Sequence, residues 1–271
     1  MQGEIYVYVL ADYGGTQDLA FAEVSQRLYS ECAPLPISVH KYAVPAFDTY
    51  ATGFALAQLA INSRLAGAQK FFVNTAPRKD DLTPRQKNAG EGFAYVRLQN
   101  GVEICAVNSG YSLSFVKDAA AEIREIKCDR AGSQFRSRDI FPEAFARVLK
   151  GDTAVLGDDI VQSVPDRPEN VLCYTDGYGN LKCAIDPAFL DAHRGQSLMV
   201  EINGHSQKVK VSEGIFGVAD GDFCFSPGSS GWALPDGRQV RFCEIVRRGG
   251  SAASVFGHPQ GGAKISVLAK A

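Results

Sequence analysis

A run of small and polar residues, ADYGGTQD, follows a short apolar segment near the start of the chain. The glycines Gly14 and Gly15 would let the backbone approach a ligand closely, and the Asp12 carboxylate can accept two hydrogen bonds from a ribose diol. The run lacks the GxGxxG and GK[ST] patterns of phosphate-binding loops. An ordinary strand-to-helix turn, in which Asp18 caps the next helix, explains the same residues. The sequence leaves both interpretations open.

Two further polar clusters follow later apolar segments. The first is VNTAPRKDD, which contains Asn74 and Asp81, and the second is AVNSGYS, which contains Asn108. In open α/β sheets, ligands bind beyond the carboxyl ends of the strands, so these side chains are candidate ligand contacts. Each cluster taken alone is equally typical of a solvated loop.

The segment SQFRSRDIFPEAFARVLKG, residues 133–151, combines a cluster of polar and charged residues in its first half with a helical pattern in its second half. The apolar residues of its second half fall on one face, and Gly151 can end the helix. Its first half crowds Arg136, Ser137, Arg138 and Asp139 together, although a surface turn needs nothing so specific. We therefore expect this loop to deliver polar groups to a site.

Cysteine and histidine show no metal-binding pattern. The seven cysteines form no CxxC pair, and the four histidines have neither HExxH nor HxxxH spacing. An odd number of cysteines that lie among apolar neighbours is typical of buried, reduced thiols in a cytosolic protein. The sequence predicts no metal, no disulfide framework and a cytoplasmic location.

Alternating strand-like and helical patterns fill the first half of the chain. An Asn-Gly pair at 100–101 predicts the tip of a hairpin over residues 93–110. This order predicts a mainly parallel sheet sandwiched by helices. The expected strands are residues 4–11, 36–42 and 70–74, and the expected helices are 18–31, 47–67 and 140–149.

The pattern changes after Gly151. A stretch rich in proline and aspartate predicts a linker over residues 156–169. Short strand-like runs follow, separated by turn signals such as Asp176-Gly177 and Asn203-Gly204, and they predict a small β-barrel. The expected domains are therefore an α/β domain over residues 1–155 and a barrel over residues 170–271.

Composition excludes several classes of protein. The 271 residues are 45% hydrophobic and 21% charged, as in an ordinary globular protein. A formal net charge of −2 provides no bulk basic surface for nucleic acid or anionic lipid. The start, MQGEIYVYVLAD, reaches an aspartate after a short apolar run, so we expect neither a signal peptide nor a membrane span.

The order of these motifs resembles that of the S-adenosylmethionine hydroxide adenosyltransferases, a family that also contains the fluorinases and chlorinases. LADYGGTQD looks like its TDFG…D turn, VNSG like its PDNG, and SQFRSRDIF like its TFHGRDIF. In the second half, VLCYTDGYGNLKCAID is similar to a v…iDrFGNliTNI strand pair, and CEIVRRGGSAASVFG to an lEIAvN.GsAA segment. The resemblance covers nearly the whole chain.

The resemblance implies a fold, a ligand and an assembly. The family joins an α/β domain to a small β-barrel and forms a homotrimer, with S-adenosylmethionine between neighbouring subunits. Water or a halide attacks C5′ of the ribose and expels methionine, without a cofactor. By the same resemblance, the ribose ligand is Asp12, and the other substrate contacts are Asn108, Asp176, Tyr178, Asn180, Ser229, Ser230, Glu244 and Arg248, with Asn74, Asp81, Arg136 and Ser137 on the reaction side.

Three of these positions depart from the water-using members. Asn74, Asp81 and Arg136 stand where those members carry Asp, Arg and His. An amide cannot act as a base and an arginine stays protonated, so we expect weak hydrolysis to adenosine and methionine. Arg136 and Asp81 can instead form an ion pair, in which the positive charge stands at position 136 and the negative charge at position 81. The alternative is a non-catalytic homologue that binds S-adenosylmethionine or adenosine, or a purely structural trimer. The segment around residues 233–242 is longer than in the family, and the sequence assigns it no role.

Overall fold

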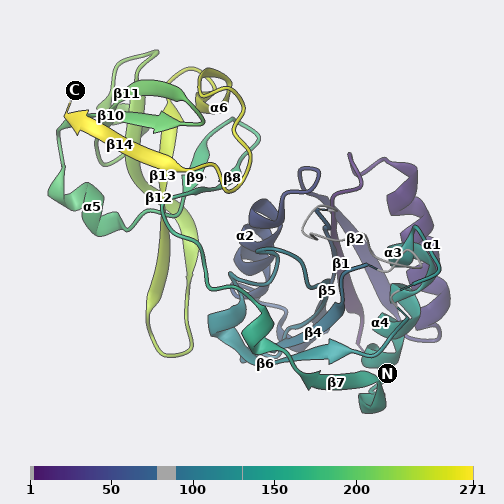
Figure 1. Cartoon of the computed structure of the whole chain (residues 1–271). Coiled ribbons are helices and arrows are strands. Elements are labelled where there is room, and N and C mark those ends of the chain that lie inside the picture. Colours follow the sequence, from purple (N-terminus) through teal and green to yellow (C-terminus); the bar gives the residue numbers. More distant parts are fainter. Residues whose placement is uncertain (1–2, 78–89, 130, 271) are drawn as a thin grey trace. The chain divides into compact units, whose positions relative to one another are not determined.

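The computed structural model describes residues 3–77, 90–129 and 131–270. The chain forms two compact units, Met1–Asp166 and Arg167–Ala271 (Figure 1).

The first unit consists of a sheet with helices packed on it. Among its described residues, the strands and α-helices are β1 (Ile5–Ala11), α1 (Leu19–Cys32), β2 (Ile37–Ala43), α2 (Thr49–Ala60), β3 (Gln69–Asn74), β4 (Phe93–Leu98), β5 (Glu103–Val107), β6 (Ala120–Ile126), α3 (Arg136–Asp139), α4 (Phe141–Leu149) and β7 (Leu156–Asp159).

Its seven strands are ordered β2-β1-β3-β5-β4-β6-β7. The first four run parallel to one another, whereas β4, β6 and β7 each pair antiparallel with their neighbours. The predicted parallel sheet is therefore correct for four of the seven described strands, and the unit is a mixed α/β structure. The difference arises because the 93–110 hairpin reverses the chain without a crossover helix.

Helices cover both faces of the parallel half, with α2 on one face and α1, α3 and α4 on the other (Figure 1). Alternate residues of β1, such as Val7 and Val9, pack in one core with Phe21 of α1 and Phe145 of α4. The inner parallel strands β1, β3 and β5 are largely buried, which explains their mostly apolar sequences, whereas the edge strand β2 is more exposed. Asp18 caps α1 by accepting a hydrogen bond from the Ala20 N–H at 2.9 Å.

The predicted linker is wrong in its first part. Residues 156–159 form β7, which pairs with β6 at the edge of the sheet, and the boundary between the units falls after Asp166. Polar β7 residues are tolerated there because an edge strand is exposed on one side. The long helix expected over residues 47–67 is also shorter, because α2 ends at Ala60.

The second unit is dominated by strands. Its elements are β8 (Leu172–Thr175), β9 (Leu181–Cys183), α5 (Pro187–Ala192), β10 (Ser197–Ile202), β11 (His205–Val211), β12 (Phe223–Ala233), β13 (Gln239–Arg247), α6 (Ala252–Val255) and β14 (Ile265–Lys270).

These strands form one sheet, ordered β14-β10-β11-β12-β13-β9-β8, which curls into a half-barrel (Figure 1). The two edge strands approach each other at a single bridge between Val171 and Lys264. The predicted barrel is thus present as a curled sheet. Within it, β12 and β13 extend as a long hairpin that contains the segment around residues 233–242, and Trp232 of this hairpin is only 3% exposed.

None of the cysteines forms a disulfide, and all except the partly buried Cys128 are buried. Among the described residues, no helix is long and apolar enough to cross a membrane.

Candidate functional site

A pocket of about 410 Å³ lies in the first unit, where β1, β3 and β5 end. Its walls combine aromatic side chains with charged and amide groups, which is the composition of a small-molecule site. The lining residues are Asp12, Tyr13, Ala20, Phe47, Asn74, Ala76, Glu91, Val107, Gln134, Phe135, Arg136, Ser137 and Phe141.

Four of the residues predicted from the sequence meet in this pocket. They are Asp12 after β1, Asn74 at the end of β3, and Arg136 and Ser137 in α3. They come together because parallel strands end at one edge of the sheet, and α3 packs against α1 beside that edge.

Asp12 fixes the loop that follows β2. Its Oδ2 atom accepts a hydrogen bond from the Phe47 N–H at 3.0 Å. Phe47 has a φ of +62°, a left-handed conformation that is uncommon for a bulky residue, and its ring is exposed. The carboxylate therefore helps to hold an exposed aromatic ring at the wall of the pocket.

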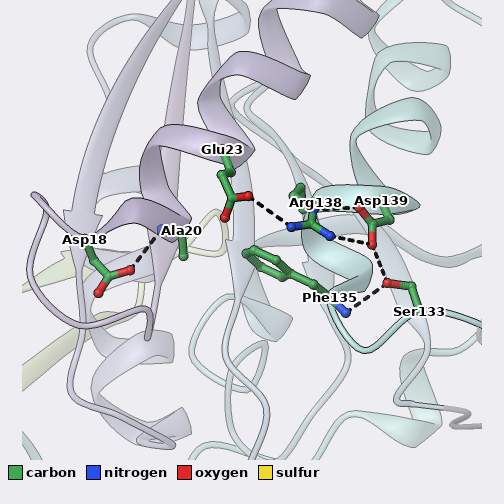
Figure 2. A network of polar contacts seen from close by, with 7 residues as sticks. All are labelled: Asp18, Ala20, Glu23, Ser133, Phe135, Arg138 and Asp139. Carbon is green, nitrogen blue, oxygen red and sulfur yellow. Dashed lines mark hydrogen bonds and ion pairs between the residues drawn. The ribbon is translucent and has the colours of Figure 1, made fainter.

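The segment before α4 is anchored to α1 by a network of polar contacts (Figure 2). Arg138 donates through Nε to Asp139 Oδ1 at 2.7 Å and through Nη1 to Glu23 Oε1 at 3.0 Å. Ser133 donates to Asp139 Oδ2 at 2.5 Å and accepts from the Phe135 N–H at 2.9 Å. Together these contacts fix the backbone on both sides of Arg136. Arg138 and Asp139 thus position the segment and do not line the pocket themselves.

Tyr13 is a pocket residue that the sequence analysis did not select. Its ring packs edge-on against Phe21 and Phe135, with centroids 5.1 and 5.8 Å apart. Its hydroxyl oxygen is buried and forms no hydrogen bond of ordinary geometry with any described residue. Burial raises the pKa of the phenol far above its usual value, and the nearby Ser137 hydroxyl opposes this only partly. Tyr13 is therefore a neutral hydrogen-bond donor at any ordinary pH.

Glu91 is the second unexpected residue. It precedes β4, and its Oε2 atom lies 3.5 Å from Arg136 Nη2. Both side chains are mostly buried, at 12% and 17% exposure. The expected partner of Arg136, Asp81, lies outside the described residues. Asn108 does not line the pocket, because its side-chain amide donates to Ser163 Oγ at 2.9 Å.

A second polar cluster lies on the half-barrel. Lys182 is buried between two carboxylates, with Nζ 2.7 Å from Glu244 Oε1 and 3.3 Å from Asp176 Oδ2. Asp176 also accepts hydrogen bonds from the N–H groups of Tyr178 and Asn180 and from the Asn180 side chain, at 2.9–3.0 Å. Burial alone would raise the pKa of Asp176, but the bonds from Asn180 and Lys182 outweigh it and leave the pKa lowered. The sequence analysis missed Lys182 because an isolated lysine in a strand carries no motif.

Of the other residues predicted on this unit, only Ser229 contacts this cluster in the described structure. Ser229 donates its N–H to Glu244 Oε1 at 3.2 Å, whereas the described contacts give Ser230 no comparable role. Arg248 donates to the Val218 carbonyl at 2.7 Å and lies 5.7 Å from the Phe216 ring. Phe216 and Tyr178 are 85% and 84% exposed, which is rare for large aromatic side chains. Phe216 lies beside Arg248 of the turn after β13, and Tyr178 precedes Gly179, whose carbonyl accepts a hydrogen bond from the Ala253 N–H of α6.

No group of three or more His, Cys, Asp or Glu side chains suited to a metal ion occurs in the described part of the chain.

Comparisons with known proteins support the fold. No protein-family model and no curated protein matches the chain. Solved structures do: an uncharacterized conserved protein from Thermotoga maritima is similar with a TM-score of 0.70 and 19% identity, over 97% of this chain and 100% of that one. A conserved hypothetical protein from Thermus thermophilus is similar with a TM-score of 0.65 and 19% identity, over the same shares of the two chains. At this identity, the likeness shows a shared fold and nothing about activity.

Proposed function

We propose that this protein binds S-adenosylmethionine or adenosine in the pocket of the first unit, and that it catalyses attack of a small nucleophile at C5′ only weakly. One observation carries the proposal. Asp12, Asn74 and the adjacent residues Arg136 and Ser137 come from three segments that are far apart in sequence. All four are predicted from the sequence as ligand or reaction-side residues, and they line a single pocket.

The shape and charge of the pocket suit this ligand. Tyr13, Phe47 and Phe135 provide aromatic walls against which a nucleoside can pack. The ionisable carboxylates and guanidinium among the described lining residues are Asp12, Glu91 and Arg136, which sum to a charge of −1. A sulfonium carries a charge of +1, so the pocket complements the cationic ligand electrostatically.

Asp12 is assigned to the ribose. A carboxylate offers about four acceptor positions, enough to hold both the Phe47 N–H and a pair of ligand hydroxyls. In the family that the sequence resembles, water or a halide is the nucleophile. The protein there mainly positions the reactants, because the sulfonium is already a good leaving group.

Calorimetry with S-adenosylmethionine and with adenosine tests the proposal. We expect binding by the wild-type protein and a loss of about 1–3 kcal/mol in Asp12→Ala, because a hydrogen-bonded charged group is removed. Asp18→Ala is the matched control, since Asp18 belongs to the same turn but only caps α1. Absence of heat with either ligand at millimolar concentration would refute the proposal, and equal affinities of wild type and Asp12→Ala would place the ribose elsewhere.

The resemblance also assigns residues of the second unit to the ligand and implies a homotrimer. Tyr178→Ala tests the first assignment: the ring is exposed, so its removal should weaken binding without lowering stability. Light scattering tests the second, with an expected mass of about three times the 29.2 kDa chain.

A non-catalytic ligand-binding role is the second candidate, because Asn74 and Arg136 cannot accept a proton. Incubation with S-adenosylmethionine, followed by chromatography for adenosine or a 5′-halo-adenosine, separates the two candidates.

A further inference from the structure

Glu91 brings a carboxylate into the pocket beside Asn74 and Arg136, neither of which can accept a proton. It lies two residues before β4, which runs antiparallel to β5, with Phe93 opposite Val107. The beginning of an antiparallel strand lies at the same sheet edge as the ends of the parallel strands. Glu91 therefore reaches the pocket from the beginning of a strand, whereas a search for ligand contacts after the carboxyl ends of parallel strands would not find it.

The neighbouring Gly90 holds the partner of Glu91 in place. A Cβ atom at position 90 would lie only 1.6 Å from Arg136 Nη2, so the guanidinium rests directly on the glycine backbone. Arg136 remains protonated at any ordinary pH and lies 3.5 Å from Glu91. The Glu91 carboxylate therefore lies beside a fixed positive charge in the wall of the pocket.

The other groups of the pocket are poor proton acceptors. The amide of Asn74 and the guanidinium of Arg136 cannot take a proton, and the hydroxyls of Ser137 and Tyr13 are donors at neutral pH. Asp12 is the other described carboxylate, and it holds the Phe47 N–H.

From this arrangement, and resting on the proposed function, we infer that Glu91 is the proton acceptor for a water molecule that attacks C5′ of S-adenosylmethionine. The water oxygen forms a bond to C5′ while the C5′–S bond breaks. The electron pair of the broken bond stays on sulfur, which converts the sulfonium into the neutral thioether of methionine. One proton of the water passes to the Glu91 carboxylate and from there to solvent. The products are adenosine, methionine and one proton, so atoms and charge balance.

Glu91→Gln is the decisive variant, because it preserves the shape of the side chain and removes its basicity. We expect kcat for adenosine release to fall by about 10²–10⁴-fold, the usual contribution of general-base catalysis, while the Kd for S-adenosylmethionine from calorimetry stays within a few-fold. Glu91→Asp should recover part of the activity, because it restores a carboxylate on a shorter side chain.

The matched control is Glu103→Gln. Glu103 is also a partly buried, ion-paired glutamate, bonded to Lys70 and Tyr95, but it lies at the opposite end of β5 from the pocket. Its replacement should leave kcat unchanged. Circular dichroism and thermal unfolding of both variants establish that they are folded.

The pH profile provides a readout that a structural role would not change. Wild-type kcat should fall with one-proton dependence as the base is protonated at acidic pH, and Glu91→Gln should lose this dependence in its residual activity. The other titratable or charged side chains among the described residues that line the pocket are Asp12, Tyr13 and Arg136. An acid limb that persists unchanged in Glu91→Gln would show that Glu91 is not the base.

Each outcome decides the inference. Loss of turnover in Glu91→Gln with retained binding supports it. Turnover that survives Glu91→Gln overturns it, and so does a wild-type protein that binds the ligand without converting it. A wild-type protein that binds neither nucleoside refutes the proposed function itself, and calorimetry distinguishes this failure from the other two.

Discussion

Replacing Lys182 by methionine tests the polar cluster of the second unit. Methionine retains most of the apolar stem and removes the ammonium group that lies between Asp176 and Glu244. The Nζ atom is 2.7 Å from one carboxylate oxygen and 3.3 Å from the other, and the lysine side chain is only 11% exposed. At an effective dielectric constant of about 20, these distances give Coulomb energies of about 6 and about 5 kcal/mol.

Most of this attraction is offset by the dehydration of the three charged groups. Removing one partner of a buried pair nevertheless costs about 3–5 kcal/mol, because the remaining charge loses its counterion and stays buried. Asp176 keeps its hydrogen bonds from Tyr178 and Asn180 in the variant. We therefore expect the lower end of the range, about 3 kcal/mol, as a decrease in the free energy of unfolding of the second unit.

Urea unfolding followed by tryptophan fluorescence measures this change. Trp232 is the only tryptophan of the chain and lies in β12, which pairs with the strand that carries Glu244, so its signal reports on the second unit. The urea midpoint should fall by about 1–3 M, since small domains have m-values of about 1–3 kcal/mol/M.

Arg194→Met is the control, because Arg194 also bonds two carboxylates, Asp191 and Glu213, but its side chain is 55% exposed. It should leave the midpoint unchanged, since solvent competes for exposed ion pairs. If Lys182→Met shifted the midpoint no more than Arg194→Met, burial would not make the Lys182 pairs strong and the reasoning would be refuted.

Three further predictions follow from single side chains. Tyr13→Phe should not lower stability, because the hydroxyl has no partner of ordinary geometry among the described residues, but it should weaken ligand binding several-fold; equal affinity would show that the hydroxyl does not meet the ligand. Gly90→Ala should displace the Arg136 guanidinium and reduce turnover, and unchanged kinetics would show that the position of Arg136 is not critical. The lowered pKa of Asp176 stabilises the fold above the usual carboxyl pKa of about 3.9, and this stabilisation is lost as the pH falls through the lowered value. The stability difference between wild type and Asp176→Asn should therefore be constant above about pH 5 and shrink below about pH 4, and a difference that stays constant in acid would contradict this.

The parts of the fold that could be predicted from the sequence are those whose residue pattern depends on local geometry. β1 is apolar throughout because it lies inside the sheet between β2 and β3, and Asp18 stands where a helix cap is required. β7 was missed because Leu156–Asp159 is a polar edge strand, and neither periodicity nor apolar content distinguishes it from a linker.

The same limit applies to the candidate site. Asp12 and Asn74 follow parallel strands, and the position after such a strand is a site signal that can be read from sequence. Glu91 precedes an antiparallel strand, so its place at the same edge depends on the sheet order, which the local sequence does not reveal. Lys182 can be identified as a site residue only from its ion pairs with Asp176 and Glu244, which lie in other segments of the chain.

The exchange of charges in the pocket connects these observations. Compared with the family that the sequence resembles, position 74 lacks an acid and position 136 carries a positive charge. Without Glu91, the charges of Asp12 and Arg136 would cancel, and the described lining would have no net negative charge to attract a sulfonium. Glu91 pairs with Arg136 and restores a net charge of −1 together with Asp12. The described lining residues thus keep the net negative charge that the proposed cationic ligand requires, although the residues that the resemblance would place there have changed. In the proposed function the Glu91 carboxylate has two roles, because it contributes to the net charge that attracts the sulfonium and it accepts the proton. Glu91→Gln removes both the charge and the basicity while it keeps the shape of the side chain. A Kd that stays within a few-fold beside a fall in kcat of about 10²–10⁴-fold would therefore show that proton transfer is the larger role.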